Sequence, residues 1–379
     1  MGISRRTILL GLAGTALASC GGGVSAPAPG ASYRVVRNAG YDDWVRGFRS
    51  RAASGGISAS TLDRAFQGAG YMPEVVEKDR NQTEFSRTLE DYLAIAASDE
   101  RVSKGRAALA RHRSTLSAIE SRYGVPANVV TAVWGLESYY GERRGDVPVI
   151  SATSTLAYDG RRGAFFEKQL MAALKILQNG DVSAGNMTGS WAGAMGHTQF
   201  IPTTYLAYAV DFTGDGRRDI WSEDPTDSLA STAAYLSASG WARGQTWGGE
   251  VGSAAASSGT PEAVIQPQVP GPRFAVFRNF RVIKRYNNSD SYALGVGHLA
   301  DRIAGGGPLK TGFGPDANGM TIDDRKELQK RLTARGFDTE GSDGVIGPKS
   351  KSAIAAYQRS IGLPATGEPS VDLLRRLGG

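Results

Sequence analysis

The sequence predicts a mainly α-helical protein with an export leader at its N-terminus and a small separate domain at its C-terminus. Apolar residues recur at three-to-four-residue spacing through most of the chain between residues 41 and 303, which is typical of helices packed against a core. Glycine and proline punctuate these stretches. A glycine-rich linker, residues 306–319, then precedes a last block, residues 320–379, that has its own helical pattern.

The composition excludes several classes of protein. Hydrophobic residues make up 41% of the chain and charged residues 21%, which are ordinary values for a globular protein. The net charge of +6 falls to about +4 once a leader with Arg5 and Arg6 is removed, and no basic stripe is present, so no nucleic-acid partner is expected. The single cysteine and three scattered histidines predict neither a disulfide nor a zinc site.

Residues 1–19 are typical of a secretory signal peptide. Arg5 and Arg6 precede an apolar run from Ile8 to Leu17, which is too short to span a membrane. The basic pair also resembles a twin-arginine export signal, and the sequence leaves the twin-arginine and general export routes open. The leader therefore predicts a protein exported to the periplasm.

Cys20 follows this leader directly, and residues 17–20, LASC, resemble a bacterial lipobox. In such proteins the cysteine is lipidated and becomes the new N-terminus, which predicts membrane contact through a lipid. Gly21, rather than an aspartate, follows the cysteine, and this favours the outer membrane. The alternative is a plain cleaved signal with an incidental cysteine. Residues 20–33 are rich in glycine, alanine and proline and are expected to form a flexible tether.

Residues 34–305 are expected to form one helical domain, in which an alternating stretch, 273–285, predicts a short strand. The segment 244–275 is rich in glycine, serine and proline and predicts an irregular excursion. The last block predicts three helices joined by glycine and proline turns. Helical patterns in the large domain occupy residues 42–53, 61–70, 85–98, 101–124, 164–178, 226–239 and 291–303.

A single glutamate stands inside the apolar stretch VWGLESYYG. With Pro126 as the first helical position, Trp134 and Glu137 fall on one buried stripe and Gly141 ends the helix. Burial beside an indole raises a carboxyl pKa, so Glu137 is expected to hold a proton near neutral pH and to act as an acid. The alternative is a glutamate at the helix end that reaches solvent or pairs with one of the two arginines that follow.

Four blocks occur in this order: VWGLESYYG, GSWAGAMGHTQFIPTTY, DFTGDGRRDIW and RYNNSDSYALGVGHLADRI. Together they closely resemble the membrane-bound lytic murein transglycosylase B family over about residues 41–302. The last block of the chain, with LQKRLTARGF, DGVIGPKSKSAIAAYQ and GLPATG, resembles the small peptidoglycan-binding domain often appended to these enzymes. The resemblance implies a lysozyme-like catalytic domain followed by a three-helix domain that binds the cell wall.

The resemblance implies cleavage of the MurNAc–GlcNAc β-1,4 bond of peptidoglycan without water, which leaves 1,6-anhydro-MurNAc ends. Glu137 would be the only catalytic carboxylate. It would protonate the leaving oxygen and then take the proton from the sugar's own 6-hydroxyl. A hydrolytic muramidase remains an alternative, with Glu142, Asp146 or Asp159 as the second carboxylate. A non-catalytic wall-binding lipoprotein is a further alternative, against which the presence of Glu137 argues.

The resemblance also implies substrate-binding residues. Ser190 is expected to hydrogen-bond near Glu137, Gln199 to bind substrate, and Phe200 to offer a stacking contact. The matched positions expected to line the catalytic centre are Tyr235, Tyr286, Asn287 and Tyr292. For each tyrosine alone, packing in the core is the alternative.

Four further positions are left more open. Arg161 and Arg162 match a basic pair that could face the peptide carboxylates of the wall or simply solvent. The family more often has an aromatic residue and a glycine where this chain has His197 and Thr198, so the contacts made there are in doubt. We expect His197 to form part of the cleft wall rather than to act as a catalytic base.

The block DFTGDGRRDIWS resembles half of an EF-hand loop. The first, third, fifth and ninth positions are Asp211, Thr213, Asp215 and Asp219, whereas the twelfth, normally a bidentate acid, is Ser222. No cofactor is expected to be required. The loop either holds a structural calcium ion or forms only a hydrogen-bonded turn.

These observations together predict a lipid-tethered periplasmic lytic transglycosylase. Its expected partners are peptidoglycan glycan strands and membrane lipid, with other cell-wall enzymes as candidates. The C-terminal domain needs no chemistry of its own, because binding the wall raises the local concentration of substrate.

Overall fold

The computed structural model describes residues 33–81 and 87–378. The predicted signal peptide, Cys20 and nearly all of the predicted tether lie outside the described residues. Helices dominate and the strands are short, which confirms the predicted mainly α-helical class. Within residues 33–81 and 87–378, no helix is both long enough and apolar enough to cross a membrane.

The chain divides into two compact units. The N-terminal unit contains residues 33–81 and 104–244, and the C-terminal unit contains residues 87–103 and 245–378. The C-terminal unit therefore includes a helix from the first third of the chain, α4 (Leu89–Ala96). The chain passes from this unit into the other along α5 (Asp99–Arg111).

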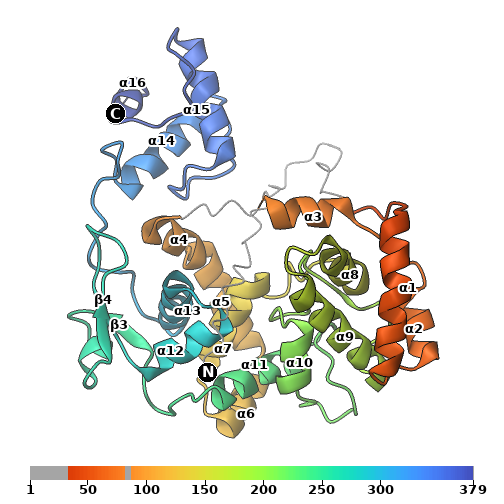
Figure 1. The fold of residues 1–379 in the computed structure, drawn as a ribbon. Helices are drawn as coiled ribbons and strands as arrows, with labels where there is room; N and C mark the ends of the chain where they lie inside the picture. The colour runs from red at the N-terminus through yellow and green to blue at the C-terminus, as the bar shows by residue number, and fades with distance from the viewer. Residues whose placement is uncertain (1–32, 82–86, 379) are drawn as a thin grey trace. The chain divides into compact units, whose positions relative to one another are not determined.

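In the N-terminal unit, α8 (Val149–Asp159) and α9 (Gly163–Asn179) pack against each other. Figure 1 shows α1 (Ala39–Ser54) and α2 (Ala59–Phe66) along the outside of this pair, where α1 contacts α8 and α2 contacts α9. α3 (Pro73–Arg80) also packs on α8. Buried apolar side chains fill the space between these elements: Met72, Val75, Val147, Ala152, Leu156, Ala157 and Phe166.

The helix α7 (Ala127–Ser138) of this unit is deeply buried, with nine of its 12 residues buried. A helix that is apolar on every side belongs in a core, and α7 is covered by its neighbours α6 and α11. The remaining elements of the unit are α6 (Arg113–Tyr123), α10 (Pro202–Tyr208), α11 (Thr226–Ala238) and the antiparallel pair β1 (Val147–Pro148) and β2 (Thr188–Gly189).

The C-terminal unit contains an antiparallel sheet of order β3-β5-β4, formed by β3 (Gly248–Glu250), β4 (Ala263–Ile265) and β5 (Phe274–Val276). The strand predicted in residues 273–285 is confirmed for β5, but the chain becomes helical from Arg278, where buried positions recur at helical spacing. This unit also contains η1 (Ala255–Ser257), α12 (Arg278–Tyr286) and α13 (Asp290–Ile303), which packs on α4 and α12.

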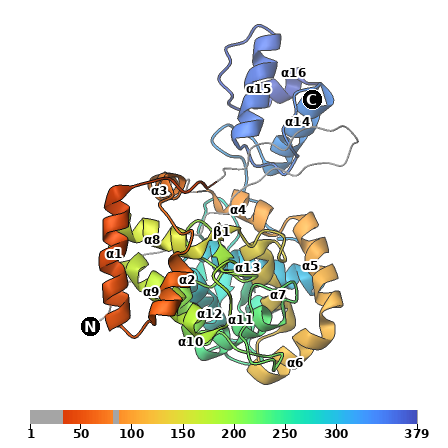
Figure 2. The ribbon, with the colours of Figure 1, turned by 90° about the vertical axis from the view of Figure 1, so that its right-hand side faces the viewer.

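The last three helices, α14 (Ile322–Ala334), α15 (Pro348–Ser360) and α16 (Val371–Arg376), form their own small bundle, as predicted (Figure 2). Thr321 and Asp324 form a reciprocal capping box that fixes the start of α14. The helices share one apolar core: Met320, Leu328, Leu332, Ile354, Tyr357, Leu373 and Leu377.

The segment that leads into this bundle is attached to the rest of the C-terminal unit. Both carboxylate oxygens of Glu250 accept backbone N–H groups, from Lys310 and Thr311, at 2.7 Å each. Phe313 is 9% exposed, and its ring lies against Gly271. The residues predicted to form a linker therefore hold fixed contacts.

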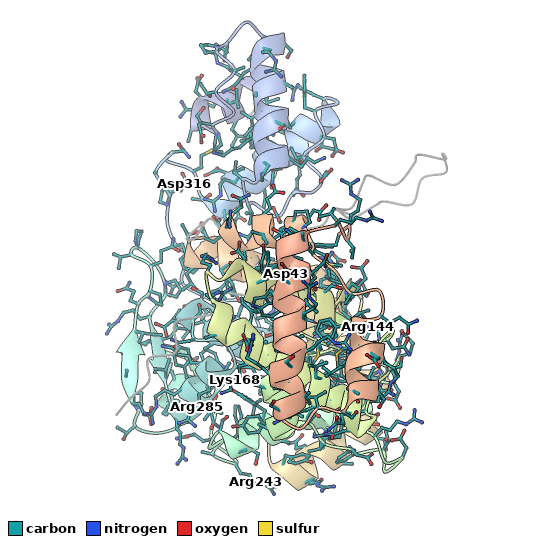
Figure 3. The ribbon with its side chains drawn as sticks, turned by 45° about the vertical axis from the view of Figure 1, so that its right-hand side comes forward. Asp43, Arg144, Lys168, Arg243, Arg285 and Asp316 are labelled. Carbon is teal, nitrogen blue, oxygen red and sulfur yellow. The ribbon has the colours of Figure 1, made fainter. Side chains whose placement is uncertain are left out.

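A buried arginine joins the bundle to α4. The Arg325 side chain, 5% exposed, donates to Glu90 at 2.6 Å, Asp91 at 3.2 Å and Asp316 at 2.9 Å. Its Nε donates to the carbonyl oxygen of Gly344 at 2.7 Å. Figure 3 shows Asp316 on the segment that enters the bundle. One guanidinium thus links α14, that segment and α4.

We predict that Arg325→Met lowers the free energy of unfolding of the C-terminal unit by about 3 kcal/mol, because Glu90 would remain buried without its cation. Urea unfolding followed by circular dichroism measures the change. The matched control is Lys326→Met on the same helix, whose pair with Asp323 is exposed, so a loss below about 1 kcal/mol is expected. Equal losses for the two variants would contradict the prediction.

Candidate active site

Glu137 lies in the last turn of α7, between the buried residues Leu136 and Ser138, and its own side chain is partly exposed. The helix is one residue shorter at its start than predicted, since Pro126 is the N-cap rather than the first helical residue. It also ends earlier than predicted, at Ser138. The two residues that follow Ser138 both have a left-handed backbone, so the chain turns away directly after the glutamate.

An aromatic wall lies beside this helix end. Trp134, three residues before Glu137, is 4% exposed, and its ring meets His112, Tyr140 and His197 edge-on at centroid distances of 5.5–5.8 Å. The predicted indole next to the glutamate is therefore present. That this wall raises the pKa of Glu137 stays a prediction.

Arg144, one of the two arginines that follow the helix, is bound to the last two residues of the predicted calcium loop and to the residue after it. It forms an ion pair with Glu223 and donates to the carbonyl oxygens of Trp221 and Ser222, both at 2.9 Å. Figure 3 labels Arg144 at the edge of the N-terminal unit. The other arginine, Arg143, lies over the ring of Tyr139 at 4.6 Å.

Two predicted substrate-binding residues, Ser190 and Gln199, form hydrogen bonds with the protein backbone. The Oγ of Ser190 accepts the backbone N–H of Ala194 at 3.1 Å. The side-chain amide nitrogen of Gln199 donates to the carbonyl oxygens of Arg144 and Gly196, both at 2.9 Å, so its two hydrogens are used and only its carbonyl oxygen could serve a ligand.

Phe200 is 2% exposed and lies in the core, 6.1 Å from the ring of Tyr235. This burial favours packing over the predicted stacking contact with a sugar, because a covered ring presents no open face. Tyr235 is only partly buried and also meets Tyr208, 4.8 Å away. Tyr235 is therefore less buried than Phe200, and its predicted place at the catalytic centre stays a prediction.

The remaining predicted contacts, Tyr286, Asn287 and Tyr292, lie in the C-terminal unit. The two tyrosine rings are nearly parallel, with centroids 6.4 Å apart, and Tyr292 is 5% exposed. Asn287 closes α12, and its Oδ1 is buried with no hydrogen-bond partner among the described residues. A buried acceptor without a partner is costly, so this atom is a candidate for binding a donor group of a ligand.

Arg161 and Arg162 bind Asp79 of α3, a residue that the sequence did not single out. The Asp79 side chain is 1% exposed and accepts from both arginines, at 2.6 and 2.7 Å. Burial alone would raise the pKa of Asp79, but the two guanidinium hydrogen bonds outweigh it, so the pKa lies below its usual value. Arg161 and Arg162 thus bind a buried carboxylate of the protein itself. This contact favours neither of the predicted alternatives, which were contact with the peptide carboxylates of the wall and exposure to solvent. No local sequence pattern around Asp79 predicts that it binds these two arginines.

Two of the acids considered as a second carboxylate are paired with cations. Glu142 accepts from Lys104 at 2.7 and 2.8 Å. Asp159 accepts from Arg80 at 2.6 Å. Each of these two carboxylates is thus bound by a neighbouring cation.

The predicted calcium loop is folded as a turn around its own carboxylates. Asp211 accepts hydrogen bonds from the backbone of Gly214, Asp215 and Gly216 and from the Thr213 hydroxyl. Within residues 33–81 and 87–378, no three or more His, Cys, Asp or Glu side chains are gathered as a metal site requires. The loop carboxylates thus take part in the turn itself, and calcium binding there stays one of the two predicted alternatives.

Asp227, at the start of α11, organises the same loop from outside. Its Oδ1 accepts the N–H groups of Phe212 and Thr213, and its Oδ2 accepts that of Asp219, at 2.9–3.0 Å. Sequence inspection missed Asp227 because it lies beyond the 12 positions of the loop pattern. The Asp227 carboxylate of α11 thus holds the loop in place through three backbone hydrogen bonds.

Two protein families match the chain. The family described as "Transglycosylase SLT domain" matches residues 40–301, and the "Putative peptidoglycan binding domain" matches residues 321–377. The membrane-bound lytic murein transglycosylase B of Escherichia coli (strain K12) is 32% identical over 214 residues. That match covers 48% of this chain and 58% of the E. coli protein, so the chain spans little more than half of this curated relative.

Solved structures are similar over more of the chain. SltB3 from Pseudomonas aeruginosa, solved in complex with NAG-anhNAM-pentapeptide, is 45% identical, with a TM-score of 0.69 over 90% of this chain and 100% of that chain. SltB1 from the same organism is 31% identical, with a TM-score of 0.61 over 69% of this chain and 98% of that chain. These neighbours support the lysozyme-like class of the fold.

We predict that Asp79→Asn lowers the free energy of unfolding of the N-terminal unit by about 3 kcal/mol at pH 7, because it removes the buried partner of two arginines. The folded pKa is below the unfolded one, so this stabilisation is present above about pH 4 and is lost as pH falls through the folded pKa. Urea unfolding at several pH values measures the change.

The control for this prediction is Asp43→Asn, because Asp43 and its partner Arg46 are both mostly exposed. A loss below about 1 kcal/mol is expected there. A difference between wild type and Asp79→Asn that does not shrink in acid would show that the ion pair is not its source.

Proposed function

Because the chain belongs to the transglycosylase SLT domain family, we propose that it is a lytic transglycosylase that cleaves the glycan strands of peptidoglycan. One observation carries this proposal. Glu137 is a partly exposed carboxylate at the end of a buried helix, three residues after a buried tryptophan. That environment suits an acid which holds its proton until a leaving oxygen needs it.

In the proposed reaction Glu137 acts twice. It donates its proton to the glycosidic oxygen between MurNAc and GlcNAc as the C–O bond breaks, while the N-acetyl oxygen of the sugar stabilises the anomeric carbon. As a carboxylate it then removes the proton of the same sugar's 6-hydroxyl, whose oxygen closes onto the anomeric carbon. The glutamate ends protonated, the MurNAc end becomes a 1,6-anhydro sugar, and no water is consumed.

The pairing of Glu142 and Asp159 supports this single-carboxylate mechanism. A hydrolytic glycosidase needs a second carboxylate that is either a nucleophile or a base for water. Glu142 and Asp159 are held by Lys104 and Arg80. The complex of SltB3 with a ligand that contains an anhydro sugar is a further support for the proposed product.

We further propose that the C-terminal bundle binds peptidoglycan and that the protein works in the periplasm. The match to a putative peptidoglycan binding domain supports the first proposal. The leader, Cys20 and the membrane-bound relative support a lipid anchor, and Gly21 supports the outer membrane as its location. Other cell-wall enzymes remain candidate partners. The loop at residues 211–222 is proposed to act as a hydrogen-bonded turn that needs no calcium.

We predict that Glu137→Gln lowers kcat on purified peptidoglycan by at least about a hundredfold, because glutamine can neither donate nor accept the proton. Mass spectrometry of the released muropeptides measures both rate and product, since an anhydro end is lighter than a reducing end by one water. The matched control is Glu142→Gln, five residues on, which is expected to keep most of the activity.

Full activity of the Glu137→Gln variant would overturn the site. Reducing ends in place of anhydro ends would make the protein a muramidase, and binding to peptidoglycan without any release would favour a non-catalytic wall-binding lipoprotein.

We predict that excess calcium leaves the melting temperature of the protein unchanged relative to the chelated protein. The carboxylates of the loop already accept backbone hydrogen bonds, so an ion would have to displace them. A site filled at a hundredfold excess over its Kd would add about 2.7 kcal/mol and raise the melting temperature by several degrees. Differential scanning calorimetry with calcium and with chelator distinguishes the two outcomes.

A further inference from the structure

His197 lies against the end of α7, where the chain turns away after Glu137. Its backbone carbonyl accepts a hydrogen bond from Ser138 Oγ at 2.5 Å, and that Oγ accepts the N–H of Gly141 at 2.9 Å. Its ring lies directly over Gly141, where an added Cβ would come within 2.6 Å of Nδ1. These contacts hold the residue after Glu137 and the turn that follows.

The imidazole ring adds a second attachment. Nδ1 of His197 lies 3.2 Å from Nε1 of Trp134, and Nε2 lies 2.8 Å from the carbonyl oxygen of Ser222. An indole N–H only donates and a carbonyl only accepts, so Nδ1 must accept and Nε2 must carry the proton. Only the neutral ring in its Nε2–H tautomer satisfies both bonds.

We propose that neutral His197 is a positioning residue that ties the Glu137 end of α7 to the segment ending at Ser222. The ring and the backbone of one residue thereby hold Trp134 and Ser138, which lie three residues before and one after the glutamate. The inference rests on the proposed function of Glu137. It assigns a role to the position where this chain departs from the family's usual aromatic residue.

A second proton on His197 would break this arrangement, because an N–H on Nδ1 would face the indole N–H of Trp134. Burial lowers the pKa of His197, and the Arg144 guanidinium, 3.3 Å from Nε2, lowers it further. The hydrogen bond to Ser222 and the acids Glu223 and Asp224 oppose this shift without cancelling it.

Further titratable side chains here are Glu137 on α7 itself, and His112 and Tyr140, whose rings pack against the same tryptophan. Since the pKa of His197 lies below its ordinary value of 6.5, the ring is neutral at and above neutral pH, and acid disrupts the attachment.

Nitrogen NMR of histidine tests the ring directly. The chain has three histidines, so a protein labelled with ¹⁵N-histidine gives few signals, and the signals lost in His197→Asn assign that residue. We expect His197 to be in the Nε2–H tautomer and to titrate below pH 6.5. An Nδ1–H tautomer, or titration above pH 6.5, would overturn the proposal whether or not the protein cleaves peptidoglycan.

Kinetics test the consequence. His197→Asn places a carbonyl oxygen near the position of Nδ1 but cannot reach Ser222 and cannot titrate. We expect kcat to fall roughly tenfold to a hundredfold with little change in KM, as a small displacement of Glu137 would cause. The loss of activity in acid should also move to lower pH. Ser138→Ala, which cuts the link to the carbonyl but leaves the ring, should lower kcat and keep the wild-type acid limb.

His298→Asn is the control, because it removes a second buried histidine with a lowered pKa from the C-terminal unit. Its kcat and acid limb are expected to match wild type. Wild-type kcat and an unshifted acid limb in His197→Asn would overturn the proposal. If Glu137→Gln keeps full activity, the proposed function fails, while the NMR result still decides how His197 is held.

Discussion

The burial of α7 is the constraint on which the site depends. A helix enclosed on all sides cannot shift without moving its neighbours, because protein interiors are packed as densely as organic crystals. Glu137 lies in the last turn of this enclosed helix. Its backbone is therefore held in place by the packing of the helix, while the residue stays partly exposed. The left-handed residues Tyr139 and Tyr140 then redirect the chain directly after the helix.

Several charged groups of the N-terminal unit stabilise the structure. Asp79 and two arginines join α3 to the start of α9, and Arg144 connects the turn after α7 with the segment at 221–223. The acids next to the site are held by cations in the same way. This pairing of Glu142 and Asp159 is consistent with a mechanism that needs only one carboxylate.

The C-terminal bundle is also attached by ion pairs and hydrogen bonds between buried charged groups and their partners. Arg325 is enclosed by three carboxylates and one carbonyl, and Glu250 fixes the segment that approaches it. A wall-binding domain on a loose chain only raises the local concentration of substrate. Here the bundle is attached to α4 by the contacts of Arg325.

The sequence by itself determined the helical class, the three-helix bundle, the strand at β5 and the glutamate beside a tryptophan, because these follow from periodicity and from short-range patterns. Only the tertiary structure decided which polar residues are consumed by folding. Nothing near Arg161, Gln199 or Phe200 in the chain reveals that Asp79, a backbone carbonyl or the core lies against them. Such contacts join residues tens of positions apart, and a pattern read along the chain carries no information about them.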